Sequence, residues 1–96
     1  MALGKFFKSL LGAAPRPPAE PVVYEGFSIE PEPIEEEGRF RTAGYISGEL
    51  DGETRRVRFI RADQHADRQT AIDHSVSKAR QIIDEQGARL LAKGQL

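Results

Sequence analysis

The strongest constraint on the fold is the dipeptide Asp51-Gly52, which stands between two segments of β-type sequence. An Asp-Gly pair is a strong signal for a two-residue hairpin, because a type I′ turn needs positive φ at both central residues. The segments that it joins are residues 40–50 and 54–62, and both contain alternating β-branched and aromatic side chains. The sequence therefore predicts an antiparallel hairpin.

A two-residue turn also fixes the register of the two strands, because Leu50 must then lie opposite Glu53. The pairs predicted on one face are Ile46 with Val57 and Gly44 with Phe59. The pairs predicted on the other face are Tyr45 with Arg58 and Ser47 with Arg56. Since the first face is apolar, we expect it to be buried, with the ring of Phe59 covering the exposed backbone of Gly44.

A first strand is predicted over residues 23–30, with Phe27 and Ile29 on the buried face. Pro31 and Pro33 follow it, which favours an edge strand, and the sequence IEEEG is expected to form a loop. In this arrangement Glu30 should lie near Arg41.

One long helix is predicted to follow the hairpin, with Asp67 as its N-cap. Its buried stripe is predicted from apolar residues spaced by 4, 3, 4 and 7 positions, namely Ile72, Val76, Ala79, Ile83 and Leu90. We expect the helix to continue to about Lys93 and to stop at Gly94. The predicted class is α+β: a three-stranded antiparallel β-meander packed on one long C-terminal helix.

A short amphipathic segment precedes this unit. Within residues 2–11 an apolar face is formed by Leu3, Phe6, Phe7, Leu10 and Leu11, with Lys5 and Lys8 opposite. A proline-rich linker follows, so we assign residues 1–21 to leader and linker and residues 22–96 to a single domain. The segment either pads the core or contacts a membrane surface or a partner.

The composition excludes several classes of function. The absence of cysteine excludes disulfides, thiolate metal sites and cysteine nucleophiles, and it is typical of a cytoplasmic protein. No apolar run reaches the roughly 20 residues of a membrane span. No glycine-rich phosphate-binding motif is present, so no cofactor is predicted.

The candidate acid–base or metal-binding residues are few: Asp63, His65, Asp67, Asp73 and His74. The two histidines do not have a metal-ligand spacing, and His74 is expected to point away from the core. We therefore predict no metal site and no catalytic site, and expect a protein that is not an enzyme.

The open face of the predicted sheet is the one candidate binding surface. It should carry Arg41, Tyr45, Arg56 and Arg58, side chains suited to phosphates and base edges. The net charge of −1 favours the alternative that these arginines pair with glutamates across strands. The expected partner is DNA, or a protein that could be a second copy of the chain. For a protein partner, residues 57–62 are the preferred sheet edge because they contain no proline.

Several blocks of the sequence occur together in one known family. The blocks YEGFSIEPEP, RTAGYISGELDGE, FIRAD and KARQIIDEQG, in this order, resemble the HlyU-like family of small bacterial proteins. The similarity covers about residues 22–91. Members are labelled transcriptional activators of haemolysin, so the resemblance implies a regulatory role. It implies no catalytic or ligand-binding residues.

Overall fold

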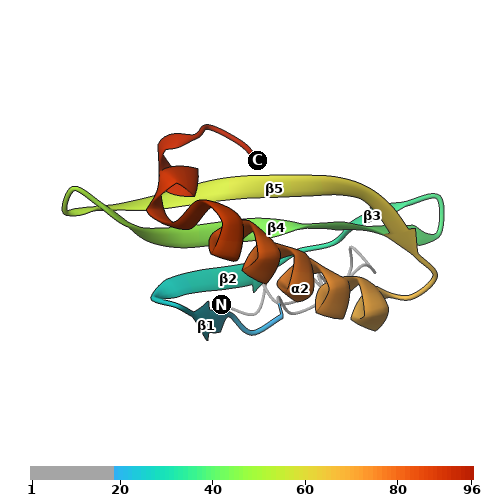
Figure 1. Ribbon diagram of the computed structural model, residues 1–96. Helices are drawn as coiled ribbons and strands as arrows, with labels where there is room; N and C mark the ends of the chain where they lie inside the picture. The colour runs from blue at the N-terminus through green and yellow to red at the C-terminus, as the bar shows by residue number, and fades with distance from the viewer. Residues whose placement is uncertain (1–18) are drawn as a thin grey trace, which may run out of the picture.

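The computed structural model describes residues 19–96, and in this part the chain has an α+β fold. A five-stranded antiparallel sheet carries helix α2 (Arg68–Gln86) across one face (Figure 1). The predicted class is confirmed, whereas the predicted number of three strands is wrong. The predicted N-terminal amphipathic segment lies outside the described residues.

The strands follow one another as an antiparallel meander. Their bounds are β1 Val22–Tyr24, β2 Phe27–Pro31, β3 Ile34–Glu36, β4 Arg39–Leu50 and β5 Glu53–His65. The long strand β4 pairs with β2 and β3 along one edge and with β5 along the other. Strand β1 extends the sheet beyond β2.

Two turns that the sequence analysis missed account for the additional strands. Glu25-Gly26 joins β1 to β2, and Glu37-Gly38 joins β3 to β4, with positive φ at all four residues. The predicted strand over residues 23–30 is therefore divided, and the predicted IEEEG loop is strand β3 with its turn. Glutamate seldom adopts positive φ, so a Glu-Gly pair indicates a hairpin less clearly than the Asp-Gly pair does.

The two prolines interrupt an inner strand rather than marking an edge strand. Pro31 lies opposite Gly44 and Ile34 opposite Arg41, so β2 and β3 keep the same register against β4 on both sides of the break. Because β1 pairs with the other side of β2, the prediction of an edge strand there is wrong.

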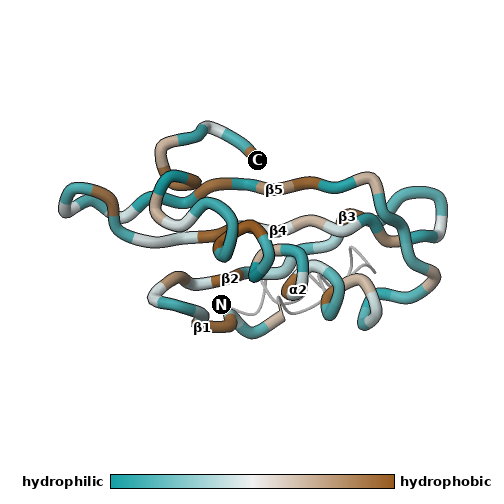
Figure 2. The backbone as a smooth tube through the Cα atoms, in the orientation of Figure 1, coloured by the Kyte–Doolittle hydropathy of each residue, from teal (hydrophilic) through white to brown (hydrophobic). Residues whose placement is uncertain are grey.

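The register of the β4–β5 hairpin is confirmed. Ile46 lies opposite Val57, and Gly44 lies opposite Phe59. The buried apolar side chains gather between this face and the C-terminal segments: Ile29, Ile46, Val57, Phe59, Ala79, Ile82, Ile83, Leu90 and Leu91. Figure 2 shows hydrophobic colour recurring along α2 and along the strands that it crosses.

Helix α2 begins as predicted but packs and ends differently. The side chain of Asp67 accepts a hydrogen bond from the Thr70 amide (2.9 Å) and caps the helix. The residues that face the sheet are Ala71, Ser75, Ala79, Ile82 and Ile83. The predicted stripe is therefore partly wrong. Small residues lie where the helix comes nearest to the sheet, and Ile72 and Val76 lie half-buried on the flank of the helix.

Gly87, with φ of +57°, ends α2 by donating its backbone N–H to the carbonyl of Ile83. A 3₁₀ turn, η1 (Gly87–Ala92), then buries Leu90 and Leu91. The prediction of one helix to Lys93 is therefore wrong, although the periodicity identified Leu90 correctly as a core residue. A glycine with positive φ is a common helix terminator. Within residues 19–96 no helix has the length and apolarity needed to cross a membrane.

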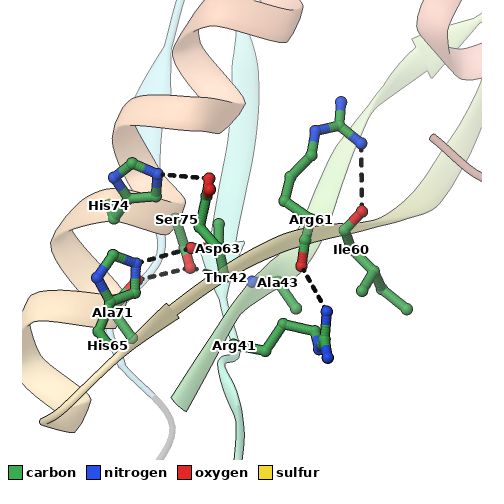
Figure 3. A network of polar contacts seen from close by, with 10 residues as sticks. All are labelled: Arg41, Thr42, Ala43, Ile60, Arg61, Asp63, His65, Ala71, His74 and Ser75. Carbon is green, nitrogen blue, oxygen red and sulfur yellow. Dashed lines mark hydrogen bonds and ion pairs between the residues drawn. The ribbon is translucent and has the colours of Figure 1, made fainter. Parts of the chain in front are cut away.

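Ser75 joins the helix to the sheet where strand pairing is irregular. The β4–β5 register shifts between Arg41 and Ala43. The Ala43 amide donates to Ser75 Oγ (3.1 Å), whose hydroxyl donates to the Ala71 carbonyl (2.7 Å) (Figure 3). Because buried amides without a partner are costly, this hydroxyl stabilises the close packing of helix on sheet.

Replacement of Gly44 by valine should destabilise the fold despite the better strand propensity of valine. A Cβ atom at Gly44 would lie 2.5 Å from the Glu30 carbonyl oxygen and 3.1 Å from the Phe59 ring. Overpacking of this kind costs about 1–3 kcal/mol. We expect a lower urea midpoint for Gly44→Val. Gly94→Val serves as the control, because Gly94 has no neighbour within 4 Å of that position. An unchanged or higher midpoint for Gly44→Val would contradict the packing.

Loss of the Ser75 hydroxyl should also lower stability. Ser75→Ala leaves the buried Ala43 amide without its acceptor, which costs about 1–3 kcal/mol of unfolding free energy. Ser77→Ala, an exposed serine of the same helix, should change it by less than about 0.5 kcal/mol. Equal effects of the two variants in urea unfolding would show that the hydroxyl makes no special contribution.

Candidate functional site

The face of the sheet turned away from α2 is built from alternate residues of four strands. Tyr45 lies opposite Glu30 of β2 and opposite Arg58 of β5, and Ser47 lies opposite Arg56. Since the opposite sides of these strands face α2, the side chains of Tyr45, Arg56 and Arg58 project from the other side, which we call the open face. The hairpin register therefore gathers three of the four predicted site residues.

Tyr45 forms the centre of this group. The guanidinium carbon of Arg56 lies 3.6 Å from the ring centroid, and that of Arg58 lies 5.4 Å from it. Arg58 Nη1 also donates a hydrogen bond to Tyr45 Oη (3.3 Å). Cation–π contacts at exposed sites contribute about 0.5–1 kcal/mol each. The ring therefore orients two cationic groups on one patch of the surface.

Arg56 is held from its other side by a carboxylate. Its Nε donates to Glu30 Oε1 at 2.9 Å, and this hydrogen bond raises the pKa of Arg56. Glu30 was predicted to lie near Arg41, but its position opposite Tyr45 brings it to Arg56 instead. The side chains of Arg56 and Glu30 are 51% and 36% exposed, so water screens this ion pair and its contribution to stability is small.

Arg41 lies further along β4 in a separate polar group. Its guanidinium contacts Glu36 Oε1 at 2.7 and 2.8 Å, and its Nη1 donates to the Arg61 carbonyl (3.3 Å). Gln64 donates to the same carboxylate oxygen (3.0 Å). The hydrogen bond from Arg41 lowers the pKa of Glu36, so this carboxylate stays ionised at neutral pH. Four residues of strand, or about 13 Å, separate Arg41 from Tyr45.

Glu36 and Gln64 were not predicted to be members of this surface. Both depend on features that were not recognised, namely the Glu37-Gly38 turn and the irregular pairing near the end of β5. The turn brings Glu36 alongside Arg39 and Arg41, and the irregularity brings Gln64 opposite Arg41. The sequence signal for this turn was the Glu37-Gly38 pair, which stands directly before a β-type segment.

Arg58 differs from the other two arginines in its contacts. Within residues 19–96 the structure records no ion pair for it, and its buried Nε has no hydrogen-bond partner. Its backbone carbonyl accepts the Leu96 amide (2.8 Å), and Gln95 forms a parallel bridge with it. The C-terminal residues therefore occupy part of the β5 edge that was predicted to be available to a partner.

A separate cluster at the junction of β5 and α2 is formed by Asp63, His65 and His74 (Figure 3). His65 Nε2 lies 3.0 Å from Thr42 Oγ1, and His74 Nε2 lies 3.1 Å from Asp63 Oδ2. The two imidazole centroids are 4.8 Å apart, and the side chain of His74 is partly exposed and lies outside the apolar core. The turn between β5 and α2 thus brings His65 and His74 together, although their spacing in the sequence is not that of metal ligands.

The other two aspartates of the predicted set have structural partners. Asp67 caps α2, and the hydrogen bonds from Thr70 lower its pKa. Asp73 accepts a hydrogen bond from Gln69 on the same helix (3.0 Å). In the part of the chain that the structure describes, no group of three or more potential ligands could hold a metal ion. The contacts of His65 and His74 connect the end of the sheet with the first turns of the helix.

Comparison with known proteins identifies the family of the chain. The model of one protein family, described as transcriptional activator HlyU, matches residues 5–91. No curated protein and no solved structure matches the chain. The family match includes strands β1 to β5 and helix α2, and therefore the open face as well. The chain therefore belongs to the HlyU family.

Proposed function

We propose that this protein is a transcriptional regulator that contacts duplex DNA through the open face of its sheet. The family description supports the regulatory role. The observation that carries the proposed surface is the pair of guanidinium groups, Arg56 and Arg58, oriented by the ring of Tyr45. Arginine binds phosphates and the acceptor atoms of guanine, and a tyrosine hydroxyl can bind phosphate oxygens. A regulator with this activity would act in the cytoplasm.

The arrangement of helix and sheet favours contact through strands. Helix α2 is the only α-helix of residues 19–96, and Ala71, Ser75 and Ala79 bury one side of it against the sheet. A helix-turn-helix reader needs two helices, of which the second lies in the major groove and the first crosses the DNA backbone. Strand-based readers instead place a sheet or ribbon in the groove, and the open face offers a surface of that kind.

The carboxylates of the open face set the strength expected of this contact. Glu30 forms an ion pair with Arg56, and Glu36 forms one with Arg41. DNA phosphates would have to replace these two carboxylates. Partly exposed ion pairs are weak, which makes such an exchange feasible. Arg58 requires no exchange of this kind, since a hydroxyl holds it rather than a carboxylate. We therefore expect Arg58 to be the most important side chain and the affinity to depend strongly on salt.

Removing Arg58 should weaken duplex binding more than removing a neighbouring arginine from the opposite face. We would titrate a fluorescent mixed-sequence duplex with the full chain and follow anisotropy at several salt concentrations. Arg58→Gln should lower the affinity and reduce the slope of log affinity against log salt by about 1. Arg56→Gln should act in the same direction, and its exposed position leaves the fold intact.

Arg55→Gln is the matched control, because Arg55 lies on the same strand and pairs with Glu53 on the helix side. It removes the same charge, but its slope should stay close to that of the wild type. Equal weakening by Arg55→Gln would indicate general electrostatic attraction without a defined face. Absence of duplex binding by the wild type at low salt would contradict the proposal.

Removing the carboxylate from Arg41 should strengthen binding. Glu36→Gln frees the guanidinium at neutral pH, whereas Glu53→Gln makes the same charge change on the helix side. We expect tighter duplex binding for Glu36→Gln than for Glu53→Gln in the anisotropy assay. Because the pKa of Glu36 is lowered, the ion pair with Arg41 is still present when the pH reaches the ordinary pKa of glutamate. It is lost only as the pH falls further, through the lowered pKa. The advantage of Glu36→Gln should shrink there, and equal affinities at neutral pH would exclude a role for Arg41.

A further inference from the structure

A groove of about 840 Å³ lies on the flank of α2, beside the first described residues of the chain. One side of the groove is formed by residues of α2, namely Arg68, Gln69, Ile72, Asp73, Val76 and Arg80. The other side is formed by residues nearer the N-terminus, namely Ala19, Glu20, Val22 and Pro31. The groove is separate from the open face, because α2 covers the opposite side of the sheet (Figure 1). It therefore offers a second surface with a different chemistry.

The apolar part of the groove follows from how α2 packs. Ala71, Ser75 and Ala79 face the sheet, and this rotation leaves Ile72 and Val76 half-buried at the groove. Two β-branched side chains one helical turn apart form a short apolar strip. An apolar strip of this kind on a helix flank fits the apolar face of a second amphipathic helix.

We infer that this groove binds the chain's own N-terminal segment, residues 2–11. That segment carries an apolar face made by Leu3, Phe6, Phe7, Leu10 and Leu11. A helix of ten residues is marginal in water by itself and is stabilised when its apolar face packs on a surface. The family match begins at residue 5, so the family pattern includes most of this segment as well as the groove.

The linker between the segment and the groove is long enough for residues 2–11 to reach the groove. Ala19 lines the groove, and the seven residues 12–18 join it to the segment. A proline-rich linker of this length spans up to about 22 Å at about 3.1 Å per residue. A ten-residue helix is about 15 Å long and α2 about 28 Å, so the segment can lie along the groove. A short tether also raises the effective concentration into the millimolar range.

Charge at the rim is compatible with the same occupant. Residues 1–19 contain no acidic side chain, and in a helix the spacing of Lys5 and Lys8 would place them opposite the apolar face of the segment. The groove is lined by the carboxylates Glu20 and Asp73 and by the basic side chains of Arg68 and Arg80. Of its basic residues, Arg80 extends toward the ring of Tyr24, with its guanidinium carbon 5.4 Å from the centroid. The rim therefore provides acceptors for the lysines of the segment.

The absence of native cysteine allows a direct test in the full chain. A nitroxide attached to Ser9→Cys should broaden the NMR signals of Ile72 and Val76, while signals of the distant Asp51-Gly52 turn stay sharp. Replacing Phe6 and Phe7 by serine in the labelled chain should abolish the broadening. Lys8→Ser, a change on the polar face of the segment, should leave it in place.

Two further measurements separate this occupant from others. In a mixture of nitroxide-labelled protein without isotope and isotope-labelled protein without nitroxide, we expect no broadening at Ile72. Broadening in that mixture would assign the groove to a second copy and overturn the intramolecular contact. No broadening in the singly labelled chain, or broadening that survives Phe6→Ser/Phe7→Ser, would also overturn it. Ile72→Ser should weaken the broadening at Val76 without unfolding the chain, since Ile72 is only half-buried.

Discussion

The register of the β4–β5 hairpin is the constraint on which the rest of the structure depends. Asp51 and Gly52, both with positive φ, place Leu50 opposite Glu53 and thereby decide which side chains of β4 and β5 face the core. A slip by one residue would exchange the apolar and the arginine-bearing sides along the hairpin. The core and the open face are thus two results of one turn.

Close packing of helix on sheet depends on small groups at the contact. Gly44 lacks a side chain where Phe59 and the Glu30 carbonyl approach it, and Ala71 and Ala79 allow α2 to come near. Ser75 adds a hydroxyl that satisfies the Ala43 amide beside the strand irregularity. The same rotation of α2 leaves Ile72 and Val76 half-buried at its flank, where both line the groove.

The sequence was sufficient for the class, the hairpin register, the helix N-cap and the grouping of Tyr45, Arg56 and Arg58. It was insufficient where structure depends on unusual conformations or on pairing over long distances. Glutamates with positive φ concealed two turns, and Gly87 ended α2 where the apolar spacing suggested continuation. The irregular end of β5 could not be read from composition, so Gln64 beside Glu36 and the imidazole contact between His65 and His74 were not foreseen.

The open face combines cations that suit a nucleic acid with carboxylates that partly neutralise them. Tyr45 fixes Arg56 and Arg58, while Glu30 holds Arg56 and Glu36 holds Arg41. The most direct measurement is an NMR titration of the isotope-labelled full chain with duplex DNA at low salt. If strands carry the contact, the arginine Nε–Hε signals and the backbone amides near Tyr45 and Arg58 should move, while those of α2 should stay. Shifts confined to α2, or no shifts at all, would contradict it.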